Sequence, residues 1–209
     1  MPIEPSRIGI SLRVRREQLG ISLREIARRI GVSASLISQI ERDKVTPSVS
    51  TLYALVTELG LTMGDVFGDG DGPAARVPAP PVARRVTEPD ERAVLNLASG
   101  VRWERLTART DSFVEFLYVV YDVGSASCDE DSLVRHGGTE YGYVISGRLG
   151  VRIAFDEYEL GPGASISFNS SAPHRLWAIG REPVHAIWVV VGRQGDPRAG
   201  GSEPPPAGS

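Results

Sequence analysis

The spacing of apolar residues changes once along this chain, and the change divides it into two parts. Up to residue 67, apolar side chains recur at steps of three and four, as in Leu23, Ile26 and Ile30, which is typical of amphipathic helices. From residue 87 to 192, short runs rich in Val, Ile, Tyr and Phe alternate with glycines and polar clusters, which is typical of antiparallel strands. The sequence therefore predicts a multidomain fold, α followed by all-β.

Composition marks the boundaries between these parts. Residues 68–86 are rich in Pro, Gly and Ala and have no apolar periodicity, so we expect a linker there. It would join an N-terminal domain, residues 1–67, to a C-terminal domain, residues 87–192. Residues 193–209 carry too few large apolar side chains to bury a core, and we expect a disordered tail.

Charge is distributed unevenly between the two domains. The whole chain has a net charge of −3, which alone argues against nucleic-acid binding, but residues 1–67 carry 9 Lys and Arg against 7 Asp and Glu. That positive part is the one expected to face phosphates. Five arginines in it could contact phosphates or form a solvated surface: Arg13, Arg15, Arg16, Arg28 and Arg29.

Cysteine content and hydropathy bear on the cellular location. A single cysteine, Cys128, excludes an internal disulfide framework and a cysteine-based zinc cluster. No apolar run approaches the roughly 20 residues that a membrane helix needs, and the first residues do not resemble a secretory signal. We therefore expect a cytoplasmic protein with no membrane partner.

Five helices are predicted in the N-terminal domain, and the second and third have the punctuation of a helix-turn-helix motif. Ser22 can cap the second helix, Gly31 supplies a permissive backbone at the turn, and Ser33 can cap the third helix. The outer face of the third helix is small and polar, and Gln39 can bind adenine through two hydrogen bonds. A helical bundle that makes only protein contacts is the alternative.

The stretch from Ile8 to Phe67 resembles the phage-repressor-like helix-turn-helix family, often called the Xre family. The resemblance implies that one group of residues faces base edges: Ala34, Ser35, Ser38 and Gln39. It implies that a second group lies near phosphates: Ser22, Arg24, Arg42 and Lys44. Ser33, at the start of the third helix, completes the predicted DNA-binding set. Asp43 stands where the family usually has glycine, and aspartate tolerates the left-handed backbone conformation.

Three residues of the C-terminal domain could meet at one point. Alternation along a predicted strand places Glu140, Gly142 and Val144 on one face, and a buried carboxylate there is costly unless it is paired or metal-bound. His136 precedes Glu140 by four residues, and His174 could join them from a later strand. Two imidazoles and one carboxylate suit Fe(II), or Zn, Ni or Mn with less discrimination. A hydrogen-bonded cluster without metal is the alternative.

This domain resembles the cupin fold, a double-stranded β-helix barrel, over about residues 100–190. His136, Glu140 and Gly147 match the second histidine, the glutamate and the glycine of its first motif. His174 matches the histidine of its second motif, whereas Val134 stands where the family has its first histidine. The resemblance thus implies three of four metal ligands, His136, Glu140 and His174, and a divalent metal as candidate cofactor.

A phage-repressor-like domain followed by a single cupin resembles a large group of bacterial regulators. The resemblance implies a sequence-specific DNA-binding transcription regulator, expected to be a repressor, whose cupin domain binds a small effector, a metal or both. Double-stranded DNA and a second copy of the chain are the expected partners, because one such domain contacts a single half-site. We expect no catalytic residues. Four arginines near the barrel would suit an anionic effector but equally suit the surface: Arg135, Arg148, Arg152 and Arg175.

Two other functions remain open at this stage. The same domain layout occurs in the iron-dependent epoxidase that makes fosfomycin, whose ligand spacing is the one seen at His136, Glu140 and His174. A mononuclear non-haem iron cupin enzyme, an oxidoreductase, is therefore the alternative to a regulator. A DNA-binding protein with a purely structural barrel is the third hypothesis.

Overall fold

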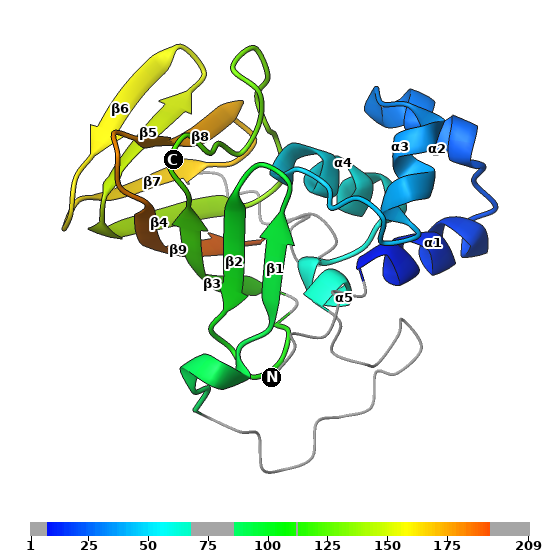
Figure 1. The fold of residues 1–209 in the computed structure, drawn as a ribbon, viewed down its shortest axis with the longest axis horizontal. Coiled ribbons are helices and arrows are strands. Elements are labelled where there is room, and N and C mark those ends of the chain that lie inside the picture. Colours follow the sequence, from blue (N-terminus) through cyan, green and yellow to red (C-terminus); the bar gives the residue numbers. More distant parts are fainter. Residues whose placement is uncertain (1–7, 68–85, 112, 193–209) are drawn as a thin grey trace, which may run out of the picture.

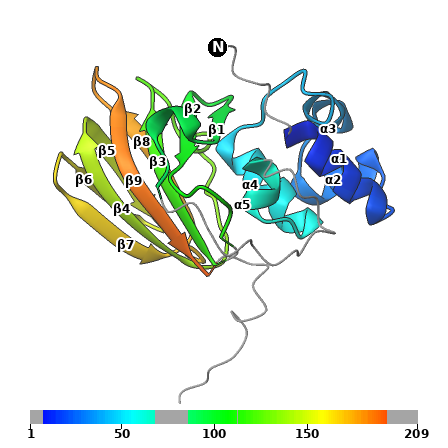
Figure 2. The same ribbon diagram turned by 90° about the horizontal axis from the view of Figure 1, so that it is seen from below.

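The computed structural model describes residues 8–67, 86–111 and 113–192, which form a helical domain beside a β-barrel (Figure 1). In both ribbon views α4 and α5 lie between the barrel and the other helices (Figure 2). The linker prediction for 68–86, except Val86, and the tail prediction for 193–209 lie outside the described residues. Within the described ranges, no helix is long and apolar enough to cross a membrane.

The predicted five helices are confirmed among the described residues. They are α1 (Ile8–Gln18), α2 (Leu23–Ile30), α3 (Ala34–Ile40), α4 (Val49–Leu59) and α5 (Met63–Phe67). The hydroxyl oxygens of Ser22, Ser33 and Ser48 each accept a hydrogen bond from the backbone N–H three residues later, which caps α2, α3 and α4. Gly31 and Gly60 end α2 and α4 with φ of 75° and 60°, a conformation that favours glycine.

α1 crosses very close to the end of α3. A Cβ atom on Gly9 would lie 2.4 Å from the carbonyl oxygen of Ile40, so only glycine fits this crossing. Asp43 follows α3 with a φ of 51°, in the left-handed region, and its Oδ1 accepts a hydrogen bond of 3.0 Å from the N–H of Gly9. The aspartate that replaces the usual glycine therefore turns the chain and also ties α1 to α3.

The C-terminal domain is built from antiparallel strands arranged in two sheets, as the cupin resemblance implies. After a short 3-10 helix (Pro89–Glu91) come β1 (Val94–Leu97), β2 (Val101–Arg105), β3 (Val114–Tyr121), β4 (Thr139–Ser146), β5 (Arg148–Ile153), β6 (Asp156–Leu160), β7 (Ser165–Asn169), β8 (His174–Ile179) and β9 (Val184–Val191). In the described part of the chain, one sheet has the order β1-β2-β3-β9-β4-β7 and the other β6-β5-β8. The barrel core lies between the two sheets.

The predicted alternation along β4 is confirmed. Glu140 and Val144 point into the barrel and are buried, whereas Tyr141 and Tyr143 on the outer face are half exposed. Gly142 is inward as well, and a Cβ atom there would lie 2.1 Å from the ring of Trp188. The missing side chain at residue 142 therefore makes room for an indole on the neighbouring strand β9.

The two domains share one buried core. At the start of α4, the N–H of Ser50 donates to the carbonyl oxygen of Ser127 at 3.1 Å, and the N–H of Ala98 donates to the carbonyl oxygen of Pro47 at 3.0 Å. Buried apolar residues form a cluster that continues from the helices into the barrel. α4 thus belongs to the helical domain and also packs against the barrel.

Candidate DNA-binding face and metal centre

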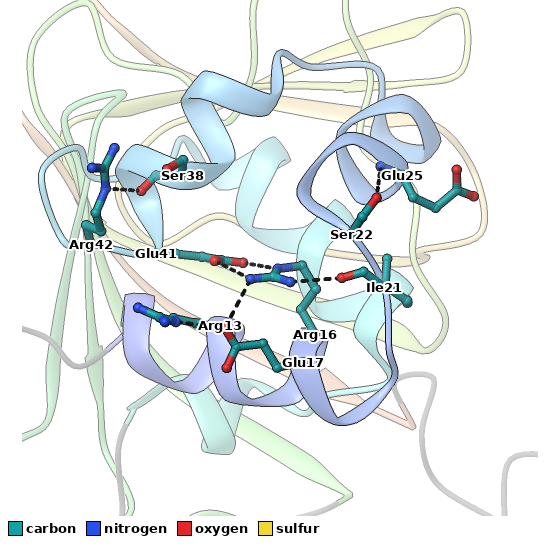
Figure 3. A network of polar contacts seen from close by, with 9 residues as sticks. All are labelled: Arg13, Arg16, Glu17, Ile21, Ser22, Glu25, Ser38, Glu41 and Arg42. Atoms are coloured by element: carbon teal, nitrogen blue, oxygen red, sulfur yellow. Dashed lines mark hydrogen bonds and ion pairs between the residues drawn. The ribbon is translucent and has the colours of Figure 1, made fainter.

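A buried ion pair fixes the end of α3 to α1 (Figure 3). Nε and Nη2 of Arg16 donate to the two carboxylate oxygens of Glu41 at 2.6 and 2.8 Å, and Nη1 donates to the carbonyl oxygen of Ile21 at 2.8 Å. The hydrogen bond to Glu41 outweighs burial and raises the pKa of Arg16. Arg16 therefore stabilises the packing of the domain and is not available to contact the phosphates of DNA.

Three other arginines of this domain pair with carboxylates. Glu25 pairs with Arg28 at 2.8 Å and with Arg29 at 2.7 Å, and the hydrogen bonds from these two side chains lower its pKa to about 2. Arg13 pairs with Glu17 one turn away, at 2.9 Å. These three pairs are exposed, so a phosphate could replace the carboxylate at small cost.

The outer face of α3 is free among the described residues. Ile37 and Ile40 are buried beneath it, whereas Ser35 is exposed and Ser38 and Gln39 are partly exposed. The side-chain amide of Gln39 donates to the hydroxyl of Ser35 at 3.2 Å, across one turn of the helix. Ala34 is partly exposed at the start of the same helix. The helix therefore presents small and polar groups of the kind that can enter a major groove.

The four residues predicted near phosphates are exposed: Ser22, Arg24, Arg42 and Lys44. Nε of Arg42 donates to the carbonyl oxygen of Ser38 at 2.9 Å, which leaves its other guanidinium nitrogens directed outward (Figure 3). Ser22 and Ser33 use their hydroxyl oxygens as caps, and each O–H can still donate to an oxygen outside the protein. None of the nine residues predicted to contact DNA is buried.

Three side chains inside the barrel converge on one point, from the segment before β4, from β4 and from β8. Ligand atoms of His136, Glu140 and His174 all lie within 4.8 Å of one another, and the three residues are buried. Nε2 of His136 is 2.9 Å from Oε1 of Glu140, and Nε2 of His174 is 3.2 Å from the same oxygen. The other oxygen, Oε2, accepts a hydrogen bond of 2.6 Å from the indole N–H of Trp188.

The hydrogen bond that Nδ1 makes in each imidazole determines whether Nε2, which faces Glu140, carries a hydrogen. Nδ1 of His136 lies 2.9 Å from the carbonyl oxygen of Gly137, and Nδ1 of His174 lies 2.9 Å from that of Ala172. Carbonyl oxygens only accept, so both Nδ1 atoms carry hydrogen, and in neutral rings both Nε2 atoms present lone pairs to Glu140. In agreement, Nε2 of His136 and Oε1 of Glu140 are buried without a hydrogen-bond partner despite their short separation.

A cation between these atoms would satisfy all three. Ligand atoms at right angles around a metal, with bonds of about 2.1 Å, lie about 3 Å apart, which is close to the observed separations. Backbone carbonyls that fix the histidine tautomer are the usual outer partners of metal-bound imidazoles. Burial alone would raise the pKa of Glu140. When the two imidazoles are protonated, hydrogen bonding to His136 and the positive charges of His174 and His136 lower it to about 2. The carboxylate is therefore ionised at neutral pH and suited to a cation.

The position of the missing fourth ligand is filled by an apolar side chain. Val134 is buried, and its backbone N–H and carbonyl form a pair of hydrogen bonds with the backbone of His174, at 2.8 and 2.9 Å. His185 lies on the outer face of the sheet, where Nδ1 is 2.7 Å from the hydroxyl of Tyr118. In the described ranges, the cluster therefore has three members, with the geometry of a three-ligand site.

A small cavity adjoins the cluster. Its other walls are mainly apolar, and they include Trp103, Leu117, Leu176 and Trp188 of the barrel together with Tyr53 of α4. The space open to the centre of a water molecule is about 20 Å³, which is room for about one water. The four arginines considered for an anionic effector, Arg135, Arg148, Arg152 and Arg175, do not line this cavity.

Comparison with known proteins agrees with this architecture. A family model described as helix-turn-helix matches residues 12–66, and a family model described as cupin domain matches residues 115–190. The chain therefore contains a helix-turn-helix domain followed by a C-terminal cupin domain. Among curated proteins, the chain is 28% identical over 141 residues to the HTH-type transcriptional regulator PuuR of Escherichia coli, an alignment that covers 67% of this chain and 70% of PuuR.

A solved structure shows the same fold. The chain matches an HTH_3 family transcriptional regulator from Vibrio cholerae with a TM-score of 0.62 and 23% identity, over 90% of this chain and 96% of that one. At this identity the likeness supports the fold and not a shared activity. A structure of hydroxypropylphosphonic acid epoxidase from S. wedmorenis matches with a TM-score of 0.42 and 23% identity, over 90% of this chain and 100% of that one.

Three features of the two sites were not predicted from the sequence. The Arg16–Glu41 pair is buried, although in the sequence its two charged residues look like part of a solvated surface. Trp188 could have been found, because alternation along β9 with Val184, Ala186 and Val190 places it inside the barrel. Tyr53 carries no such signal, since a buried aromatic side chain on a helix is first assigned to the core of its own domain.

Proposed function

We propose that this regulator binds a two-fold-symmetric DNA site through α3 and acts as a repressor that responds to the occupancy of its cupin cavity. The observation that carries the proposal is the free polar face of α3 above its buried residues Ile37 and Ile40. The regulator would act in the cytoplasm, where its DNA target lies. Direct base contacts would come from α3, and phosphate contacts from the exposed residues around it.

Specificity would depend on the middle of α3. Gln39 can donate to and accept from adenine, and the small side chains of Ala34, Ser35 and Ser38 allow the helix backbone to approach the bases. The hydrogen bond that Ser35 accepts from Gln39 would hold the amide ready in the free protein. Ser22, Ser33, Arg24, Arg42 and Lys44 would fix the orientation of the domain on the duplex without reading sequence.

A divalent metal, Fe, Zn, Ni or Mn, would bind Nε2 of His136, Nε2 of His174 and Oε1 of Glu140. Two observations support this proposal. Nε2 of His136 and Oε1 of Glu140 are buried without a hydrogen-bond partner, and Nε2 of each histidine lies close to Oε1 of Glu140. In the cavity the metal would supply positive charge and open coordination positions. The chain's own contribution is to hold both imidazoles in one tautomer and to hold the carboxylate through Trp188.

A homodimer is favoured by the outer face of the larger sheet. Phe116 and Tyr141 flank Val189 in register, and Tyr143 lies beside Ile187 on the same face. Phe116, Tyr141 and Tyr143 are 38%, 50% and 49% exposed, a concentration of aromatic surface that marks interaction sites. A second copy is the proposed occupant, because a two-fold axis through this face would pair identical patches and present two α3 helices to one operator.

DNA selection from genomic fragments, followed by footprinting, tests the proposed function. We expect protection of a symmetric site whose half-sites are about one helical turn, ~34 Å, apart or a multiple of it. Affinity should fall steeply as salt rises, because each phosphate contact releases counterions. The double substitution of Ser38→Ala with Gln39→Ala should weaken the specific site by about 1–3 kcal/mol and leave non-specific binding nearly unchanged.

The matched control is the exposed ion pair Arg148–Glu159 on the barrel. Replacing both of these residues by Ala should leave the footprint unchanged. Retention of full specific affinity by the α3 double variant, with the fold intact, would contradict the assignment of α3 as the reading helix.

A second candidate function is an oxidoreductase reaction at the three-ligand site, and the His136–Glu140–His174 arrangement is the observation that favours it. The two functions separate with the pair of substitutions His136→Ala and His174→Ala. In an enzyme these changes should abolish turnover. In a sensor they should leave DNA binding intact and remove only its response to metal or effector.

A further inference from the structure

We propose that Tyr53, which belongs to the DNA-binding domain, forms a wall of the effector cavity, and that a ligand larger than one water or one metal ion must displace it. The effector site would then be shared between the two domains, and its occupancy would be transmitted through α4. This inference rests on the proposed function of the cavity as an effector site, and it assigns the residue through which that site would be regulated.

Tyr53 contacts the metal-ligand cluster directly. Its ring centroid lies 4.7 Å from that of His136, with the two rings inclined by 33°, and 5.4 Å from that of Trp103 on β2. The side chain is buried, with a residue exposure of 8%. Val49, one turn earlier on α4, lines the same cavity. A helix of the DNA-binding domain thus contributes both an aromatic and an aliphatic wall.

The cavity is small in this arrangement. About 20 Å³ is open to the centre of a water molecule, so a metabolite of even a few heavy atoms does not fit. A metal ion is different, because Nε2 of His136 and Nε2 of His174 already lie 2.9 and 3.2 Å from Oε1 of Glu140, and all three ligand atoms lie within 4.8 Å of one another. An organic effector therefore requires one wall to move.

The wall formed by α4 is the one that can move most easily. On the barrel side, Trp188 is held by its hydrogen bond to Glu140 and fills the space left by Gly142, and the strands carry continuous ladders of hydrogen bonds. Among the described residues, two backbone hydrogen bonds join this region to the barrel: that of Ser50 within α4, and that of Ala98 to Pro47, just before α4. Displacement of Tyr53 would therefore expose the cavity at smaller cost than opening the barrel.

Movement of α4 would reach the DNA-binding face. Nη1 of Arg29 on α2 pairs with Glu58 on α4 at 2.6 Å, and Nε of Arg15 on α1 donates to the carbonyl oxygen of Leu59 at 3.0 Å. α2 in turn packs on α3, and the five helices share one core. The helical domain would consequently follow α4 and change the spacing of the two recognition helices in a dimer. The fitting effector class is a small molecule with an apolar body and one polar group directed at the cluster.

The test uses 4-methylphenol, the isolated tyrosine side chain, as a probe that can fill the space left when Tyr53 is truncated. Tyr53→Ala removes the ring and leaves a space that this probe can occupy. In full-length protein, we expect this variant to bind the selected DNA site at least about fivefold more weakly, which is the lower end of typical coupling between sites. Millimolar 4-methylphenol should restore its affinity to within about twofold of the wild type, and it should not affect the wild type.

Phe168→Ala is the matched control. The ring of Phe168 lies 5.1 Å from that of His174, so it also packs against the cluster, but it belongs to β7 and not to α4. This variant should bind DNA within about twofold of the wild type, with or without 4-methylphenol. Thermal unfolding measures whether each variant is folded. If Tyr53→Ala is unfolded, Tyr53→Leu decides, because it keeps apolar volume and loses the ring; it should weaken DNA binding in the same direction.

The outcomes distinguish this inference from the proposed function. Absence of specific DNA binding by the wild type would remove the proposed function itself. Normal DNA binding by the wild type, together with unchanged affinity in folded Tyr53 variants, would overturn only the role of Tyr53. Equal weakening in Tyr53→Ala and Phe168→Ala, without rescue by 4-methylphenol, would also overturn it, because the effect would then be a general loss of packing.

Discussion

At the scale of single residues, the buried charges of this protein have two roles. One pair holds helices together, and one carboxylate stands where a cation could bind. Arg16 and Glu41 are about as buried as the apolar residues around them, and each satisfies the other through two hydrogen bonds. Glu140 is equally buried but shares its two oxygens between an indole N–H and two imidazoles. The first arrangement is complete within the protein, whereas the second leaves acceptor atoms for a cation.

Removal of one partner from the complete pair should be costly. Arg16→Met leaves the carboxylate of Glu41 buried without its cation, and we expect a loss of about 3–5 kcal/mol in the free energy of unfolding. Urea denaturation measures the loss. The double variant Arg16→Met with Glu41→Leu should recover most of it, and Arg13→Ala, in an exposed pair, should change stability by less than about 1 kcal/mol. A loss below about 1 kcal/mol in Arg16→Met would contradict the role of the pair.

Trp188 should control metal affinity without being a ligand. Trp188→Phe keeps an aromatic ring and removes the N–H that donates to Oε2 of Glu140, so metal affinity should fall by about 10–100-fold. Competition with a chromogenic chelator measures the dissociation constant. Trp177→Phe is the control, since Trp177 stacks with Arg175 on the smaller sheet. Equal affinity in the Trp188 variant and the wild type would contradict this positioning role.

The pKa of Glu140 predicts how the metal-free protein responds to acid. Its folded-state pKa of about 2 lies below the ordinary value, so its stabilising contribution is present above about pH 4.5 and is lost as the pH falls toward 2. Glu140→Gln should therefore flatten the decline of unfolding free energy across that window. Urea denaturation in a chelator at several pH values measures it, and parallel curves for the two proteins would contradict the prediction.

At the scale of elements, α3 is too short to be stable alone and depends on its cap and its neighbours. It spans seven residues, Ala34–Ile40, and isolated helices of this length are unstable in water. The hydroxyl of Ser33 caps it at 3.1 Å from the N–H of Leu36, and the Arg16–Glu41 pair anchors its end. The orientation of the side chains proposed to contact DNA thus depends on contacts outside the helix.

Loss of the cap should therefore affect both stability and recognition. Ser33→Ala removes the acceptor for the N–H of Leu36 and should lower the free energy of unfolding by about 1 kcal/mol. Ser33→Asn keeps an acceptor and should cost less. Thermal unfolding and binding to the selected DNA site measure the two effects, and identical behaviour of both variants would show that the cap is unimportant.

At the scale of the whole molecule, the two sides of the barrel differ in what covers them. One side packs against α4, and the outer face of the larger sheet presents aromatic residues to solvent. Because β3, β9 and β4 are adjacent, Phe116, Tyr141 and Tyr143 form a continuous surface although they come from separate strands. This arrangement suits a dimer in which the sheets pair and the helical domains remain free for DNA.

Disruption of that surface should separate the dimer and weaken DNA binding together. Tyr143→Lys places a charge in the proposed interface twice, once from each copy, and should weaken dimerisation by about 2 kcal/mol or more. Sedimentation velocity measures the association. Tyr158→Lys is the matched control, because Tyr158 is similarly exposed, at 45%, but lies on β6 of the other sheet. Unchanged dimerisation in Tyr143→Lys would direct the search to another face.

Local patterns in the sequence determined the elements. Periodicity, serine caps and glycine stops act within a few residues, so the five helices and the alternation of β4 could be predicted. The resemblance to the cupin fold is what implied that His174 joins His136 and Glu140. The resemblance to two families supplied their arrangement. Sequence also identified Asp43 as a residue that can adopt the left-handed conformation.

Only the tertiary structure decided which residues from different elements meet. The Arg16–Glu41 pair, the closure of the cavity by Tyr53 and the aromatic surface of the larger sheet each join residues far apart in the chain. Their contacts depend on how the helical domain packs on the barrel and on the order of the strands. No local pattern encodes these, because a buried aromatic or a charged side chain looks the same in sequence whichever partner it finds.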